Sequence, residues 1–145
     1  QILLHGNSMG SATVCMMSGL ELPPQVKGII SDCAFTSMKE VFTHVLHSMY
    51  HIPAFPMLQI ADWANKRQVG YGLDDLSSAR EVRKAKVPFL FIHGEDDVFV
   101  PCWMTEEIYK NCASPKTKLI VKGAGHGESY YKDKEGYDRA MDSFI

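Results

Sequence analysis

Residues 6–10 read Gly-Asn-Ser-Met-Gly, with a serine at the centre and a glycine two positions to either side. A G-x-S-x-G pentapeptide between a strand and a helix is typical of a nucleophile elbow, a sharp turn that exposes the serine hydroxyl. The competing interpretation is a nucleotide-binding turn. Such turns need G-x-G-x-x-G or G-x-x-x-x-G-K-[ST], but Ser8 occupies the place of the second glycine and no lysine follows. The pattern therefore favours Ser8 as a nucleophile.

A serine hydroxyl becomes a useful nucleophile only when a base takes its proton, and that base needs a carboxylate to orient it. Two later apolar runs are followed by suitable residues: acids follow the run in "VPFLFIHGEDDVFVP", and a histidine between glycines follows the run in "KLIVKGAGHGES". The order serine, acid, histidine is the order that a nucleophile elbow of this type requires. His126 is therefore predicted as the base, and a surface position is predicted for each of the other five histidines.

The elements that position these residues alternate between strand and helix. Short apolar runs predict strands, and helical patterns follow most of them. The predicted strands are Ile2–His5, Val26–Ile30, Val87–His93 and Lys118–Val121, and the first predicted helix is Met9–Ser18. This alternation predicts an α/β fold with about four mainly parallel strands. Residues 36–85 hold two more predicted helices, 38–50 and 57–69, and such a long excursion indicates a lid-like insertion.

Composition restricts the classes of function. The chain has 145 residues, enough for one domain, and its net charge of −2 carries no electrostatic footprint for nucleic acid. No apolar run approaches the roughly 18 residues of a membrane span. Four cysteines in or beside apolar segments lack C-x-x-C spacing, so buried reduced thiols are expected. A cytoplasmic location is favoured. The chain begins inside an apolar run without Met, so we expect it to be part of a longer protein, and an upstream signal or membrane anchor stays open.

Together, "GNSMG", "HGEDDVFVP" and "GAGH" resemble the α/β-hydrolase superfamily. The chain is similar in particular to the serine aminopeptidase-like branch of bacterial hydrolases, whose members "VKGIISDCAFTS" and "AGHGESYYKD" also resemble. The resemblance extends over the whole chain, residues 1–145. It implies the C-terminal portion of an α/β-hydrolase domain, with flanking helices and the insertion at about 36–85.

The resemblance also implies individual roles. The family pattern H-G-x-x-D-x-x-V-P aligns with His93, Gly94, Asp97, Val100 and Pro101, which makes Asp97 the acid. Asp96 is then expected to be a solvated turn residue. Asp32, just after the second strand, is the reserve acid, although a hydrogen-bonding role in its own loop is favoured. The backbone N–H of Met9, directly after the nucleophile, is implied as one oxyanion donor.

In the family, the strand before the elbow is the fifth of eight. The resemblance thus implies that the chain carries strands five to eight and lacks the loop that supplies the second oxyanion donor. The first strand becomes an apolar edge, which pairs readily with other chains. We expect the 145 residues alone to aggregate and to be at least about a hundredfold less active than the parent, because one oxyanion donor contributes on the order of 10²–10³ in turnover.

The expected function is that of a serine hydrolase that cleaves an ester, thioester or amide through an acyl-enzyme, with an esterase-like activity favoured. The alternatives are a peptidase and a non-catalytic interaction module of the same fold. The expected partner is a small-molecule acyl substrate. No organic cofactor and no nucleic acid are implied. A metal site is not expected either, because His44, His47 and His51 share a helix face without a cysteine or carboxylate to complete it. Membrane association stays open.

Overall fold

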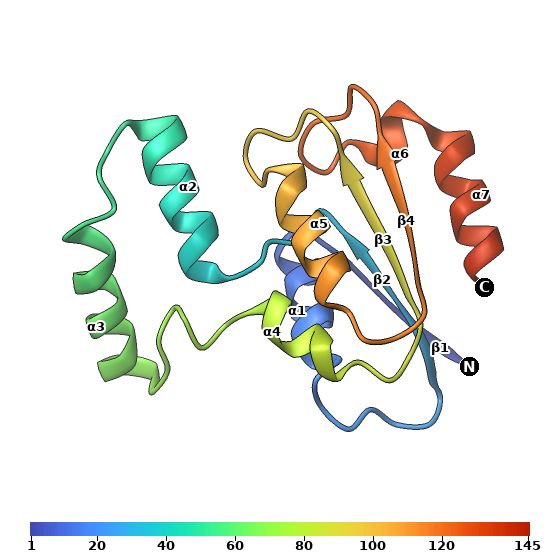
Figure 1. Ribbon diagram of the computed structural model, residues 1–145, viewed down its shortest axis with the longest axis horizontal. Helices are drawn as coiled ribbons and strands as arrows, with labels where there is room; N and C mark the ends of the chain where they lie inside the picture. The colour runs from blue at the N-terminus through green and yellow to red at the C-terminus, as the bar shows by residue number, and fades with distance from the viewer.

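The computed structural model describes residues 1–145, and its centre is a sheet of four parallel strands in the order β1-β2-β3-β4 (Figure 1). The strands are β1 (Ile2–Asn7), β2 (Val26–Asp32), β3 (Phe89–Gly94) and β4 (Lys116–Val121). Each strand pairs in parallel with its neighbour in the chain. The predicted α/β class and the parallel sheet are confirmed.

The strand boundaries differ from the predicted ones for identifiable reasons. β1 and β2 each continue two residues further, because Asn7 and Asp32 still pair with each other in register. β3 begins at Phe89 and not at Val87, since the intervening Pro88 has no N–H to donate to a ladder. β1 and β4 form the two edges of the sheet.

Helices cover both faces of the sheet. One face carries α1 (Met9–Met17), α4 (Ser78–Glu81) with the 3₁₀ turn η1 (Val82–Lys84), and α5 (Cys102–Asn111). The other carries α7 (Lys134–Phe144), which follows the short α6 (Ser129–Lys132). Successive side chains of β3 point to opposite faces of the sheet and contribute to both apolar layers. Phe89 and Phe91 pack on the first face, while Leu90 and Ile92 pack beside Tyr137 of α7. The carboxyl ends of the strands are thereby held rigidly between two apolar layers.

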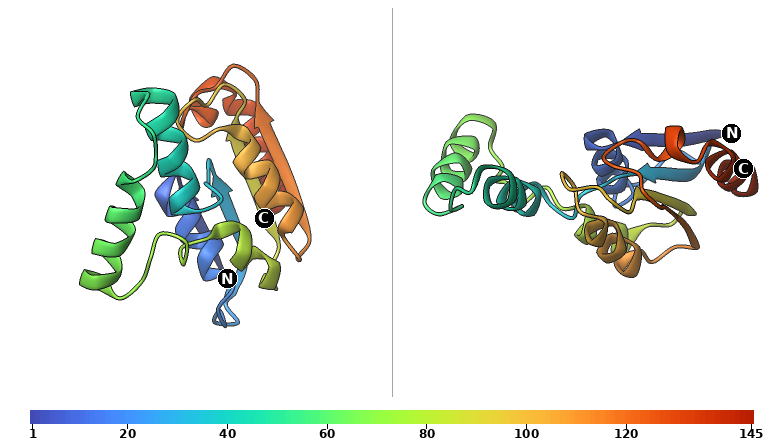
Figure 2. Two further views of the ribbon diagram at one scale, coloured as in Figure 1. Left: turned by 60° about the vertical axis from the view of Figure 1, so that its left-hand side comes forward. Right: turned by 90° about the horizontal axis from the view of Figure 1, so that it is seen from above.

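The segment between β2 and β3 contains α2 (Met38–Tyr50) and α3 (Met57–Val69), which project away from the sheet (Figures 1 and 2). The two ends of this excursion meet at an antiparallel bridge between Ser37 and Ser77. Val41 packs the base of α2 against a cluster that includes Val100 and Met104. The excursion is therefore attached to the body at its base, while most of α3 is exposed to solvent.

Two further features concern individual segments. Cys15, Cys33 and Cys112 are buried, Cys102 is partly exposed, and all four are free thiols. None of the helices combines the length and the apolar character that a bilayer crossing requires.

Candidate active site

Ser8 lies at the corner between β1 and α1 in a backbone conformation that non-glycine residues rarely adopt. Its φ is 53° and its ψ is −114°. The Ser8 N–H donates to the Asp32 carbonyl at 2.9 Å, and the Ser8 carbonyl accepts from the Ala12 N–H at 3.0 Å. Such strain persists only where neighbouring contacts hold it, and strained residues cluster at functional sites. The local geometry is therefore that of a nucleophile elbow.

The two glycines of the pentapeptide have different roles. A Cβ atom on Gly6 would lie 2.2 Å from the Gly10 carbonyl oxygen, whereas a Cβ atom on Gly10 would meet nothing within 4 Å. The close approach of strand and helix thus requires a glycine at position 6. Position 10 has no such steric requirement within this chain.

His126 reaches Ser8 from the loop after β4. The distance between Ser8 Oγ and His126 Nε2 is 2.8 Å, across 118 positions of sequence. Gly127, the next residue, has a φ of 69°, a left-handed conformation that suits glycine. The Phe99 ring packs against the imidazole with ring centroids 5.0 Å apart, in an edge-to-face arrangement. The ring of His126 is thus held from two sides.

Asp97 lies behind His126. Its Oδ2 is 2.7 Å from His126 Nδ1, and its Oδ1 accepts from the backbone N–H groups of Phe99 and Val100 at 3.0 and 2.8 Å. Burial opposes ionisation of this carboxyl, but hydrogen bonds from His126, His93 and the Val100 N–H outweigh it and hold the pKa of Asp97 well below its usual range. Asp97 is therefore a carboxylate at neutral pH.

This arrangement determines the histidine tautomer. An ionised carboxylate can only accept, so Nδ1 of His126 carries a hydrogen and donates it to Asp97. In the neutral ring, Nε2 is then left as an acceptor, and the Ser8 hydroxyl donates to it. The arrangement can remove a proton from Ser8. It brings together the three predicted residues Ser8, Asp97 and His126.

The remaining predicted residues lie as follows. Met9 is the first residue of α1, where backbone N–H groups have no partner within the helix, so its N–H is available to a ligand. Asp96 is exposed. Asp32 is buried, and its side chain accepts from the Tyr137 hydroxyl at 3.1 Å instead of contacting His126.

His93 is a residue whose place the sequence-based interpretation missed. A surface position was predicted, but His93 at the end of β3 is fully buried. Its Nε2 lies 2.7 Å from the Val100 carbonyl and 3.3 Å from Asp97 Oδ2, and its Nδ1 lies 2.7 Å from Thr105 Oγ1. His93 therefore braces the loop that carries the acid. Its position at the end of the apolar run "VPFLFIH" was the available signal.

His44, His47 and His51, the three histidines on or directly after α2, lie in different surroundings. His44 Nε2 lies 2.9 Å from the Val98 carbonyl, which ties α2 to the loop that carries Asp97. His51 follows the helix with a φ of 55°. No group of three or more histidine, cysteine, aspartate or glutamate side chains has a geometry that could hold a metal ion.

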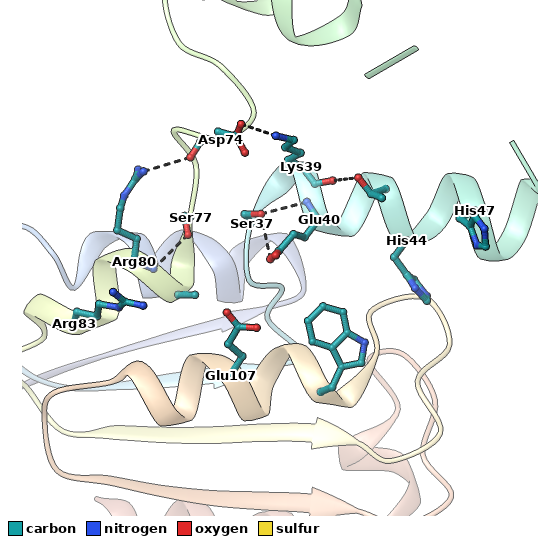
Figure 3. A pocket seen from close by; sticks show the side chains of 13 residues that line it. Ser37, Lys39, Glu40, His44, His47, Asp74, Ser77, Arg80, Arg83 and Glu107 are labelled. Carbon is teal, nitrogen blue, oxygen red and sulfur yellow. Dashed lines mark hydrogen bonds and ion pairs between the residues drawn. The ribbon is translucent and has the colours of Figure 1, made fainter. Parts of the chain in front are cut away.

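The groove between the α2–α3 excursion and the body of the chain does not include Ser8. It has a volume of about 760 Å³ and lies between α2, α4 and α5. Figure 3 shows Glu107 of α5 on one side and Glu40 of α2 on the other, with Arg83 and His44 at its ends. The groove is thus a polar gap between the excursion and the body, separate from the Ser8 site.

The parallel sheet, the helices on both faces and the elbow at the end of β1 define an α/β-hydrolase. The sequence model of the prolyl oligopeptidase family matches residues 1–145, and the chain belongs to that family. It is 32% identical over 142 residues to the uncharacterised protein YqkD of Bacillus subtilis, a match that covers 98% of this chain and 47% of YqkD. The chain thus spans about half the length of this relative.

Solved structures share the fold. An acetyl xylan esterase from Paenibacillus sp. R4 matches with a TM-score of 0.71 and 16% identity, over 99% of this chain and 45% of the esterase. An acylaminoacyl peptidase of Pyrococcus horikoshii matches with a TM-score of 0.69 and 17% identity, over 99% of this chain and 23% of the peptidase. The family and these neighbours support a hydrolase of the α/β-hydrolase superfamily.

Proposed function

We propose that this chain carries the catalytic centre of a serine hydrolase that cleaves an ester, thioester or amide of a small acyl substrate. The observation that supports the proposal most is the hydrogen-bonded series from Ser8 Oγ to His126 Nε2 (2.8 Å) and from His126 Nδ1 to Asp97 Oδ2 (2.7 Å). The strained backbone of Ser8 adds support, because it turns the hydroxyl out of the strand-to-helix corner.

In the proposed reaction, Ser8 Oγ attacks the substrate carbonyl carbon while His126 Nε2 takes the hydroxyl proton. The carbonyl oxygen becomes an oxyanion, which accepts a hydrogen bond from the Met9 N–H. Asp97 stabilises the imidazolium and keeps its orientation. The bond to the leaving group then breaks, and His126 returns the proton to that group. Water releases the acyl group from Ser8 by the same steps in the second half-reaction.

Within this class we favour an esterase-like activity. Two apolar side chains adjoin the proposed catalytic residues: Met9 follows Ser8 in the chain and is 68% exposed, and the Phe99 ring packs against His126. Neither side chain offers a partner for the charged amino terminus of a peptide. The same surroundings suit an apolar acyl group. We further propose that the α2–α3 excursion serves as a lid for the Ser8 site, because His44 of α2 lies 2.9 Å from the Val98 carbonyl on the loop that carries Asp97.

A peptidase activity is the second candidate, and a specific observation favours it: the matching family is that of prolyl oligopeptidase. The two activities use the same nucleophile and base, so the discriminating quantity is relative turnover. p-Nitrophenyl esters of increasing chain length and aminoacyl anilides are measured side by side on the intact protein. Faster turnover of the anilides than of every ester would contradict the esterase preference.

The hydrolase proposal itself is tested with a fluorophosphonate probe. We expect a covalent adduct on Ser8 of the intact protein, mapped by peptide mass spectrometry, and its loss in the Ser8→Ala variant. Asp96→Asn is the matched control, because Asp96 is exposed and lies next to the acid. An adduct elsewhere, or none on folded protein, would favour a non-catalytic module of the same fold.

A further inference from the structure

Asp32 is a buried carboxyl that the proposed mechanism does not use. It ends β2, is 3% exposed, and pairs in register with Asn7, the residue before the nucleophile. Its carbonyl accepts the Ser8 N–H at 2.9 Å. Asp32 is thus joined through the main chain to the residue whose conformation defines the elbow.

The side chain of Asp32 is anchored on the far layer of the molecule. Its Oδ2 accepts from the Tyr137 hydroxyl at 3.1 Å, and that hydroxyl lies 3.2 Å from His5 Nε2. Tyr137 belongs to α7 and packs in the apolar layer with Ile30. A rigid helix on one face of the sheet therefore fixes the end of β2, 105 positions away in the sequence.

Burial makes this carboxyl unusual. Desolvation raises the pKa of Asp32, although Tyr137, His5, His93 and Asn7 favour its ionised form. Its Oδ1 has no hydrogen-bond partner among the protein groups. A buried polar atom without a partner destabilises the folded state. Asp32 is therefore a buried acid whose side chain uses only part of its hydrogen-bonding capacity.

The backbone around Asp32 is strained at two adjoining points. Ser8 follows Asn7 with a φ of 53°, and Cys33 follows Asp32 with a φ of 51°. Asn7 and Asp32 form the last register pair of β1 and β2, so both strands turn sharply after the same rung. Residues at positive φ keep this conformation only when their surroundings hold it. The Asp32 carbonyl and its anchored side chain are in place to do so.

Asn7 extends the same group of contacts toward the base. Its side-chain amide lies within 3.6–3.9 Å of the position that a Cβ atom on Gly127 would occupy. Gly127 directly follows His126. The residue before the nucleophile and the residue after the base therefore lie close together.

We infer that Asp32, anchored by Tyr137 and His5, is a positioning residue that holds Ser8 in line with His126. The inference rests on the proposed hydrolase function. It assigns Asp32 no contact with substrate and no proton transfer. A misplacement of the order of 1 Å can cost up to about a hundredfold in turnover, and loss of the anchor acts on the chemical step more than on substrate binding.

The test compares ester kinetics and fluorophosphonate labelling rates of Asp32→Ala, Asp32→Asn and Tyr137→Phe in the intact protein. We expect Asp32→Ala to lower kcat by up to about a hundredfold with KM nearly unchanged. Asp32→Asn recovers most of this loss, because an amide oxygen still accepts from Tyr137, and Tyr137→Phe shows a smaller loss. Tyr130→Phe is the control: its ring contacts that of Tyr137 at 5.4 Å between centroids, but it does not touch Asp32.

The outcomes separate the two proposals. Absence of a Ser8 adduct in the wild type overturns the hydrolase proposal, and the positioning role falls with it. Normal wild-type labelling with unchanged kcat in Asp32→Ala or Tyr137→Phe overturns the positioning role alone. A lower melting temperature with unchanged kcat also overturns it, since that result marks a purely structural residue. Where Asp32→Ala does not fold, kcat of Tyr137→Phe decides in the same way.

Discussion

The ends of β2 and β3 are adjacent in the sheet, and each is followed or formed by a buried aspartate, yet the two carboxyls differ in their pKa and in their hydrogen-bond partners. Asp32 is 3% exposed and Asp97 is 5% exposed. The pKa of Asp32 is raised, whereas the pKa of Asp97 is lowered. Depth of burial therefore does not decide in which direction the pKa of each aspartate is shifted.

Hydrogen-bond donors explain the difference. Asp97 has two backbone N–H groups on one oxygen and two histidine rings on the other. Asp32 has the Tyr137 hydroxyl on one oxygen and no hydrogen-bond partner on the other, although the Asn7 side chain also favours its ionised form. A buried carboxylate is stabilised when its oxygens accept several hydrogen bonds, and the loop after β3 supplies them. Asp97 is thus held in its charged form, whereas Asp32 has the positioning role that we infer for it at the elbow.

The largest expected effect tests this separation directly. Asp97→Asn should lower ester turnover by about 10⁴, because an amide in place of the carboxylate favours the wrong tautomer of the histidine. Asp32→Asn should cost far less, since it keeps an acceptor for Tyr137. The measurement is kcat on one p-nitrophenyl ester, with circular dichroism as the check on folding. Equal losses in the two variants would end the distinction.

The second expected effect concerns stability and its dependence on pH. At neutral pH, Asp97→Asn should lower the free energy of unfolding by about 1–3 kcal/mol, because buried donors lose their charged acceptor. The pKa of Asp97 is depressed by folding, so its contribution is present above the ordinary value of about 4 and is lost as the pH falls toward the depressed one.

For Asp32 the sign is opposite, because folding raises its pKa. The native state then disfavours its ionisation, and Asp32→Asn should gain stability relative to the wild type as the pH rises above about 4. Urea unfolding between pH 3 and pH 7 measures how the free energy of unfolding of each variant, relative to the wild type, changes with pH. Changes of the same sign in the two variants would show that the two carboxyls share one environment.

The third expected effect concerns His93, at the end of β3. His93→Gln should reduce kcat by about tenfold, the equivalent of one lost hydrogen bond to a charged group. The reason is that His93 braces both Asp97 and the Val100 carbonyl. His47→Gln serves as the control on an exposed histidine of α2. A His93 variant with wild-type kcat would show that the backbone N–H groups hold Asp97 without it.

The smallest expected effect concerns the ring of Phe99, which lies on the loop after β3 and packs against His126. Phe99→Leu should lower kcat by about threefold, since an aromatic pair contributes roughly 0.5–1.5 kcal/mol beyond its buried area. Val98→Ala is the matched control, because Val98 lies on the same loop with 74% of its surface exposed. A larger loss for Val98→Ala than for Phe99→Leu would contradict a role of the ring in holding His126.

The amino-acid sequence by itself predicted the four strands, the elbow at Ser8 and the loop histidine His126. These features depend on local rules: apolar runs, glycine spacing and the order of elements along the chain. Asp97 followed from the resemblance to a family pattern, and the structure places it 2.7 Å from His126. The catalytic roles of these residues remain predictions.

Only the tertiary structure decided how the aspartates differ and which side chains surround them. His93 was predicted at the surface, but strand alternation and the loop after β3 bury it beside Asp97. The contact between Asp32 and Tyr137 joins residues 105 positions apart, and no local pattern encodes it. Local sequence sets backbone conformation within a few residues, whereas hydrogen-bond donors and burial depend on which elements pack together. For that reason, the acid that stays charged and the acid that anchors the elbow became distinguishable only in the folded chain.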